Sequence, residues 1–320
     1  MPDLLGELLA PLRLQGVFFS RWSARAPWGV RSEDEHCAVL HYVVGGECQV
    51  LLPGGGSVVL RAGDLAVFPR GAAHALADAP GTPTVLLDQV IPDRKAGTHT
   101  VREITGPGAA VVFLCAGLHY DELGDSPLYR ALPAMIILDR DMLRAEPLLD
   151  HTLRGLAAEG QDEEPGAGLV ALRAFEMVFV LALRTALRNL DVPTARALRH
   201  PGVSRALFAM YTRYHESWTI ESLAREAGMS RSVFSAAFHE LVGDSPGRHL
   251  AGRRMSEAAH LLRHTSVPQA TIPELVGYGT PVGFHLAFRR WSGMTPAEYR
   301  RTSRSEPQAR HVPGRQDAGR

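Results

Sequence analysis

The sequence predicts a multidomain α+β protein, with a β-rich N-terminal part followed by an all-helical C-terminal part. Short β-rich runs separated by Gly/Pro clusters fill residues 17–120, and helical periodicity replaces them beyond residue 146. The two parts of the chain also differ in net charge. Residues 1–200 hold 18 Lys+Arg and 24 Asp+Glu, a net of −6, whereas residues 201–320 hold 16 and 10, a net of +6. This asymmetry is typical of two domains, of which the basic one binds a polyanion; chance is the alternative.

The strands of the N-terminal part are predicted from short apolar runs. These are Ala38–Val44, Gln49–Leu52, Ser57–Leu60, Leu65–Phe68, Thr84–Leu87 and Ala110–Cys115. Turn-forming clusters such as Gly45-Gly46 and Pro80-Gly81 separate them. Strands repeated at about 8–12 residues are typical of an all-β sandwich or barrel.

The composition excludes several classes of protein. Hydrophobic residues make up 45% of the 320 residues and charged residues 21%, values that exclude a disordered chain or a fibre. No apolar run reaches the ~18 residues of a bilayer span, and the N-terminus lacks the features of a secretion signal. Cys37, Cys48 and Cys115 do not make a disulfide framework. We therefore expect a cytoplasmic protein with no membrane partner.

Residues 146–199 are expected to form a helical connector. Pro147–Ala158 fits a first helix, and Glu159–Gly168 fits an acidic loop. Leu169–Leu190 then carries apolar residues three and four positions apart, which are Leu172, Phe175, Phe179, Leu183, Ala186 and Leu190. This stripe predicts an amphipathic helix that either packs against the β-rich part or forms a dimer interface. The sequence leaves both readings open.

The C-terminal part contains an internal repeat. Residues 230–246 match residues 280–296 at an offset of 50, and the matched pairs are Ser230 and Thr280, Phe234 and Phe284, Phe238 and Phe288, Gly243 and Gly293, and Pro246 and Pro296. In each copy, Ser or Thr caps a helix, two Phe lie on one buried face, Gly ends the helix and Pro opens the next segment.

A short helix and a Gly-containing turn precede each copy. The first is Ile220–Ala227 with Gly228, and the second is Pro268–Val276 with Gly277. Helix, turn and helix make up the helix-turn-helix unit, whose second helix enters the major groove of DNA. Two such units joined by the amphipathic run Pro246–Arg263 are much stronger evidence than one.

Three stretches, LAREAGMSRSVFSAAFHELVGDSP, RRMSEAAHLLR and GYGTPVGFHLAFRRWSGMTPAEYR, resemble the AraC/XylS family of transcription regulators over about residues 200–301. The resemblance implies two recognition helices, 230–242 and 280–292, in adjacent turns of the major groove. The candidate DNA-binding residues are Arg289 and eight residues expected to face the groove, which are Arg231, Ser232, Ser235, His239, Thr280, Pro281, Val282 and His285. For Ser232 and Ser235, ordinary surface polarity is the alternative. Arg253, Arg254, Arg289 and Arg290 are expected to contact phosphates or to remain solvated.

The second half departs from the family pattern more than the first. Members often carry Arg in the middle of both recognition helices, where this sequence has Ala236-Ala237 and Leu286. Arg is the commonest base-specific contact, so its loss reduces the expected direct readout. Pro273 stands where the family usually has Ala. Inside a helix Pro costs ~3 kcal/mol unless it lies in the first turn, so a distorted second half is one expectation.

The N-terminal part resembles a cupin. Gly63-x5-Pro69-x-Gly71-x2-His74 is similar to the second cupin motif, with Asp78 where Asn is common. His41, Glu47 and Gly54 are similar to the first motif, whose second His falls at Val43. The resemblance implies a cupin-like β-barrel with a helical extension. We expect no cofactor; the set that would hold a divalent metal is His41, Glu47 and His74. A hydrogen-bonded core histidine and a solvent-facing Glu47 are the alternatives.

The layout is also similar to regulators that join a cupin-like sensor to this DNA-binding domain. Trp22, Trp28, His41, Tyr42 and His74 are the candidate effector-pocket residues, each with a core role as its alternative. Cys37 is a candidate redox residue, because a neighbouring His36 would lower its pKa. Cys115 lies in an apolar run and is expected to be buried and inert.

These patterns divide the chain into a cupin-like sensor domain (1–145), a helical connector (146–199), an all-α double helix-turn-helix domain (200–301) and a disordered tail (302–320). The predicted function is a transcription regulator that binds double-stranded DNA and an unknown small-molecule effector. RNA polymerase is a partner if the protein activates, and a homodimer stays open. The alternatives are a metal-dependent cupin enzyme and a degenerate interaction module. The incomplete metal-ligand set and the lack of a P-loop or nucleophile elbow favour the non-enzyme.

Overall fold

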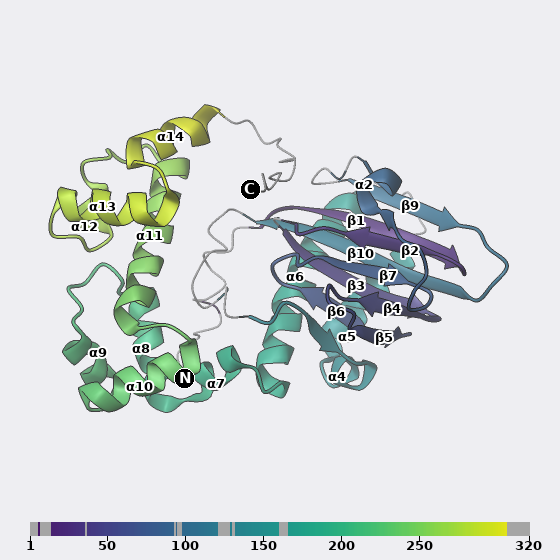
Figure 1. The fold of residues 1–320 in the computed structure, drawn as a ribbon, viewed down its shortest axis with the longest axis horizontal. Helices are drawn as coiled ribbons and strands as arrows, with labels where there is room; N and C mark the ends of the chain where they lie inside the picture. Colours follow the sequence, from purple (N-terminus) through teal and green to yellow (C-terminus); the bar gives the residue numbers. More distant parts are fainter. Residues whose placement is uncertain are drawn as a thin grey trace, which may run out of the picture.

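The computed structural model describes residues 14–35, 37–92, 98–120, 132–159 and 166–305, together with Gly6, Arg94 and Tyr129. Two β-sheets form the N-terminal part and helices form the C-terminal part, with helix α6 (Ala167–Asn189) between them (Figure 1). This arrangement confirms the predicted multidomain α+β fold.

The larger sheet has six strands in the order β11-β6-β3-β10-β1-β9. Its strands are β1 (Leu14–Arg25), β3 (Cys37–Gly45), β6 (Leu65–Phe68), β9 (His99–Ile104), β10 (Ala110–Tyr120) and β11 (Ile136–Leu138). All neighbours are antiparallel except β1 and β9, which are parallel.

The smaller sheet has five strands in the order β5-β4-β7-β2-β8. Its strands are β2 (Gly29–Ser32), β4 (Glu47–Leu51), β5 (Ser57–Arg61), β7 (His74–Ala77) and β8 (Val85–Leu86). The expected cupin-like β-rich domain is thus present, as two sheets that do not close into a barrel in the described part of the chain. Each sheet has one very short edge strand, β8 with two residues and β11 with three.

A hydrophobic core fills the space between the two sheets. The larger sheet contributes Trp22, Val43 and Phe68, and the smaller sheet contributes Val50 and Leu76. The two sheets therefore form a sandwich whose interior is apolar.

Helices cover the outer face of the larger sheet. They are α4 (Arg140–Arg144), α5 (Pro147–Glu159) and α6, while the short α2 (Leu87–Val90) follows strand β8. Phe175 of α6 packs on Phe19 of β1 with ring centroids 5.6 Å apart. The predicted apolar stripe of α6 thus packs against the sheet, which confirms the packing reading of that stripe.

Eight helices follow α6 in the described part of the chain. They are α7 (Pro193–Arg199), α8 (Pro201–Thr212), α9 (Ile220–Ala227), α10 (Arg231–Val242), α11 (Pro246–His264), α12 (Ile272–Leu275), α13 (Pro281–Ser292) and α14 (Pro296–Ser305). The expected tail begins too early, because α14 continues through Ser305; residues 306–320 lie outside the described residues. No described helix is long and apolar enough to cross a bilayer.

Two separate cores hold the C-terminal helices. Phe234 and Phe238 of α10 belong to a core that continues through α8, α7 and α6 to the outer face of the larger sheet. Phe284 and Phe288 of α13 belong to a second core, built with α12, α14 and the end of α11. Helix α11 contributes Leu250 to the first core and Met255 and Leu262 to the second, so it links the two.

Candidate DNA interface and sensor site

The first helix-turn-helix unit consists of α9, a turn at Gly228 and α10. Thr219 and Ser222 form a capping box at the start of α9, and Gly228 has a φ of 67°, in the left-handed region that favours glycine. Ser230 caps α10 by accepting the backbone N–H of Val233. These contacts confirm the predicted order of cap, helix and turn.

The second unit consists of α12, a turn at Gly277 and α13. Pro273 lies in the first turn of α12, where its missing N–H breaks no helical hydrogen bond. Pro273 therefore does not distort the second unit. However, α12 is much shorter than the predicted helix Pro268–Val276. Thr280 caps α13 by accepting the N–H of Gly283 at 3.2 Å.

The recognition helices α10 and α13 each bury two Phe and expose the opposite face. Eight of the nine candidate DNA-binding residues are exposed, and Ser235 is half-buried. The guanidinium of Arg231 lies 2.9 Å from the carboxylate of Glu221 in α9. Because water screens an exposed ion pair of this kind, it does not hold Arg231 away from another partner.

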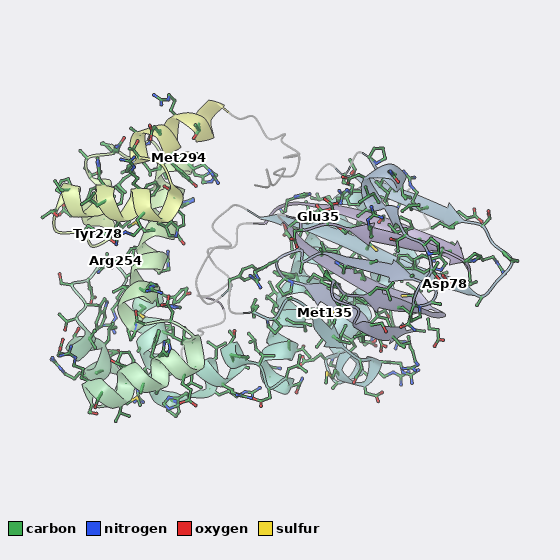
Figure 2. All side chains as sticks on the ribbon, viewed as in Figure 1. Glu35, Asp78, Met135, Arg254, Tyr278 and Met294 are labelled. Carbon is green, nitrogen blue, oxygen red and sulfur yellow. The ribbon has the colours of Figure 1, made fainter. Side chains whose placement is uncertain are left out.

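Two arginines of α11 play a different part from the one predicted. Arg253 is buried, stacks over the ring of Tyr214 at 4.4 Å and pairs with Glu257 at 2.9 Å. Arg254 donates to the backbone carbonyls of Tyr214 and Glu216, both at 2.7 Å. Free solvation is therefore wrong for both residues, whereas phosphate contact stays a prediction. They fasten α11 to the segment that follows α8, beside Tyr278 of the second unit (Figure 2).

In the N-terminal domain, a chain of hydrogen bonds crosses from one sheet to the other. Nε2 of His41 in β3 lies 2.7 Å from Nε2 of His74 in β7. Nδ1 of His74 lies 2.7 Å from the carbonyl oxygen of Ala72, and Nδ1 of His41 lies 2.8 Å from Sγ of Cys115 in β10.

The carbonyl of Ala72 fixes the protons of this chain. Because a carbonyl oxygen only accepts, Nδ1 of His74 carries the proton and its Nε2 is the acceptor in the neutral ring. His41 then donates from Nε2, and its Nδ1 accepts from the thiol of Cys115. Burial, and then the neighbouring His74, hold the pKa of His41 well below its usual range. Burial also lowers the pKa of His74 and raises that of Cys115. All three groups are therefore neutral near pH 7.

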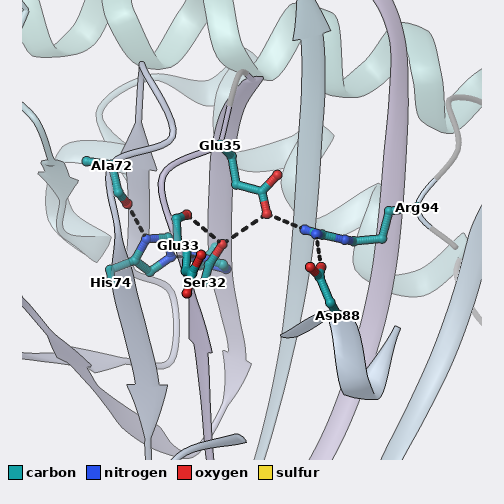
Figure 3. A network of polar contacts seen from close by, with 8 residues as sticks. Ser32, Glu33, Glu35, Ala72, His74, Asp88 and Arg94 are labelled. Atoms are coloured by element: carbon teal, nitrogen blue, oxygen red, sulfur yellow. Dashed lines mark hydrogen bonds and ion pairs between the residues drawn. The ribbon is translucent and has the colours of Figure 1, made fainter. Parts of the chain in front are cut away.

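A polar network surrounds the outer end of this chain (Figure 3). Ser32 pairs with His74 across β2 and β7, and its hydroxyl lies 3.2 Å from the Glu35 carboxylate. Arg94 donates to Glu35 and to Asp88, which ties the segment after α2 to the β2–β3 loop. The carboxylates at this end of the sandwich are thus engaged with one guanidinium.

The candidate pocket residues divide between two faces. His41, His74, Trp22 and Trp28 face the interior of the sandwich, where Trp22 and Trp28 stack on Phe113. Asp78 accepts the backbone N–H of Trp28 at 3.0 Å. Tyr42 instead faces the helices of the outer core, because successive side chains of a strand alternate. Its inclusion in the pocket is wrong.

The proposed metal ligands do not converge. Glu47 is exposed and lies 3.8 Å from Arg61, on the far side of the turn from the histidines. The ring nitrogens of His41 and His74 are engaged with each other, with Cys115 and with Ala72. Within the described residues, no cluster of three His, Cys, Asp or Glu is arranged to hold a metal ion. The residues present do not fit a cupin metal.

Cys37 does not have the predicted lowered pKa. Burial, and then the charge of Glu35, raise the pKa of its thiol to about 12. His36 lies outside the described residues. The sequence missed the pairing of Cys115 with His41, because only the antiparallel register of β3 and β10 brings them opposite each other.

Comparison with known proteins decides the family. The cupin family matches residues 3–188, and a helix-turn-helix domain matches residues 223–302. The chain belongs to the AraC/XylS family of cupin-type transcription regulators. AlkR, an HTH-type transcriptional regulator of Acinetobacter baylyi, is 26% identical over 94% of this chain and 100% of its own length. RclR, the RCS-specific transcriptional activator of Escherichia coli, is 26% identical over 93% of this chain and 97% of its own.

A solved structure matches the C-terminal part. The DNA-binding domain of AdpA in complex with a target DNA is 32% identical over 34% of this chain and 98% of that chain, with a TM-score of 0.32. The regulator binds DNA through its AraC-type domain, as its family membership shows.

Acidification is expected to destabilise the N-terminal domain of the regulator. The pKa values of His41 and His74 are lowered in the folded state, so the unfolded chain binds more protons once the pH falls below about 6.5. Their stabilising contribution is complete above that pH and decreases as the pH falls below it, because the unfolded chain then takes up protons that the folded pair excludes.

Urea unfolding at pH 7 and pH 5 measures this dependence. The His41→Gln/His74→Gln variant should lose less stability between the two pH values than the unchanged protein. The exposed His285→Gln variant serves as the matched control and should behave like the unchanged protein. Equal losses in all three proteins would contradict the assignment of the neutral pair.

Substitution of Arg231 can show whether this residue contacts a base or a phosphate. If Arg231 reads a base, Arg231→Ala should cost about 1–3 kcal/mol and relax the preference at one position. A uniform loss over all duplexes, with a shallower salt dependence, would instead assign it to the backbone. Glu221→Gln is the control, because it frees the guanidinium without removing it.

Proposed function

We propose that this regulator senses a small molecule or chemical signal inside the two-sheet sandwich and passes the response through α6 to the first helix-turn-helix unit. One observation carries the proposal: a single apolar core runs from the outer face of the larger sheet, through α6 and α7, to Phe234 and Phe238 of the recognition helix. The larger sheet therefore has the sensor interior on one face and the route to DNA on the other.

The contacts along this route are specific. Phe175 of α6 rests on Phe19 of the sheet, and Arg199 at the end of α7 donates to the carbonyls of Leu187 and Leu190. Helix α7 in turn packs on α10. A shift of β1 is thus transmitted to the first recognition helix through packed side chains. A ligand moves the balance between DNA-competent and incompetent states by its differential affinity for them.

The interior offers an effector both apolar and polar contacts. Trp22 and Trp28 supply aromatic surface, and the His41–His74 pair supplies hydrogen bonds. We propose these four residues as the effector contacts. A metal-dependent enzyme is not favoured, because Glu47 is exposed beside Arg61 and the described residues hold no cluster of three possible metal ligands.

Other partners belong to the same proposal. The face of α6 turned away from the sheet exposes Leu169, Val170, Met177 and Val180, which is where a second copy of the chain would pack in a homodimer. If the protein activates, RNA polymerase is its partner. Because the protein binds DNA, we propose that it acts in the cytoplasm.

Binding of a random-sequence duplex to the full-length protein, followed by fluorescence anisotropy, tests the regulator against the enzyme. The logarithm of the association constant should fall linearly with the logarithm of salt concentration, with a slope near −0.9 per phosphate contacted. Salt-independent binding, or bound iron with turnover of a substrate, would favour the enzyme.

The same titration tests the route through α6. His41→Gln, which perturbs the interior, should change the affinity of the full-length protein for DNA. In the Phe175→Ala background the same change should have less effect, because the contact between sheet and helix is lost. Additive effects of the two substitutions would contradict the proposed route.

A further inference from the structure

The second recognition helix, α13, exposes two large apolar side chains on its surface. Val282 and Leu286 of α13 are 71% and 65% exposed, the two highest values among the large exposed hydrophobic residues described. They lie four residues apart, so they form one stripe on the face opposite the buried Phe284 and Phe288. The stripe has no part in the core of the domain.

The internal repeat makes this stripe a difference between the two halves. At an offset of 50, Val282 and Leu286 correspond to Ser232 and Ala236 of α10. The first helix therefore presents a hydroxyl and a methyl group at the positions where the second presents two branched aliphatic side chains. The cap and the buried Phe pair are the same in both helices.

The surroundings of the stripe identify its occupant by charge. Helix α13 carries no carboxylate, and Arg289 and Arg290 are exposed in its last turn. His285 is exposed between the two apolar residues. An apolar stripe bordered by cations suits a polyanion that has apolar groups in its groove.

We propose that Val282 and Leu286 read the 5-methyl groups of thymine in the major groove. The thymine methyl is the apolar group on the base edges there, and aliphatic side chains recognise it by contact. The element bound by α13 is then read mainly through methyl groups, whereas α10 reads its element through hydrogen bonds. This inference rests on the proposed function, because it requires sequence-specific binding to DNA.

Thymine-to-uracil replacement tests the proposal, since it removes the methyl and leaves the base pairing unchanged. A duplex selected by the full-length protein is resynthesised with deoxyuridine at one thymine at a time. Replacement at one or two positions in the α13 element should weaken binding about fourfold for each methyl, the amount expected from burial of one methyl-sized group. Replacement in the α10 element should have a smaller effect.

Variants assign the methyl contacts to side chains. Leu286→Ala should abolish the sensitivity to uracil at one position while circular dichroism shows an unchanged fold, because Leu286 makes no core contact. Leu275→Ala is the matched control: this residue is exposed in α12 of the same unit but lies outside the recognition helix. Leu286→Arg should move the preference at that position from thymine to guanine, the base that Arg contacts with two hydrogen bonds.

The outcomes separate this inference from the proposed function. If no duplex is bound specifically, the proposed function fails. If a duplex is bound specifically but uracil has no effect in the α13 element, or the effect persists in both the Leu286→Ala and the Val282→Ala variants, the methyl readout is wrong.

Discussion

Phe288→Ala is expected to unfold the second helix-turn-helix unit while the rest of the regulator stays folded. Phe288 is fully buried in the core formed by α12, α13, α14 and the end of α11. Its ring centroid lies 5.7 Å from that of Phe284 and 5.3 Å from that of Tyr299. Loss of a buried Phe side chain costs about 3–5 kcal/mol. A core this small has little stability to lose.

The internal repeat supplies the comparison. Phe238→Ala is the same change at the matching position of α10, but Phe238 belongs to the core that continues to the sensor domain. The destabilisation caused by Phe238→Ala should therefore extend to α7, α6 and the larger sheet. Hydrogen exchange resolved by peptide should show lost protection confined to the end of α11 and residues 268–305 for Phe288→Ala, but spread over both domains for Phe238→Ala. Identical exchange patterns would contradict two separate cores.

Gly277→Ala is expected to displace the second unit from the first. Gly277 has a φ of 78°, and a Cβ built there would lie 2.6 Å from the backbone oxygen of His215. Arg254 holds that segment through Tyr214 and Glu216, so the backbone has little freedom to yield. Steric strain and a left-handed alanine together should cost at least about 3 kcal/mol.

Gly228→Ala is the control at the turn of the first unit. Its φ is also positive, but the nearest atom to a built Cβ is Nη2 of Arg205 at 3.0 Å, the end of a flexible side chain. We expect a cost of about 1 kcal/mol there. Thermal unfolding compares the two variants, and DNA binding by Gly277→Ala should keep contact with one element only. A larger loss for Gly228→Ala would overturn the steric account.

Local signals predicted the helical half well. Capping residues, the Phe pairs and the glycines at 228, 243 and 293 each act within one helix or turn, so sequence spacing alone locates them. Spacing alone does not predict the effect of Pro273 on stability, because that effect depends on where the helix begins. A start at Ile272 removes the cost.

Properties that depend on strand pairing were predicted less well. The sequence predicted a cupin-like barrel or sandwich, but only the pairing of the strands shows that they form two sheets that do not close. Tyr42 was assigned to the wrong face, and Cys115 was not connected to His41, because register determines both. The sequence predicted Arg253 and Arg254 as surface charges, because their contacts with the segment after α8 exist only in the folded protein.

The central claim is that two recognition helices, held by α11, read adjacent turns of the major groove. Selection of bound duplexes from a random DNA pool, with the full-length protein at moderate salt, tests it most directly. We predict a single enriched site with two elements about 10–10.5 base pairs apart, centre to centre. Enrichment of one element alone, or of no sequence at all, would contradict the claim.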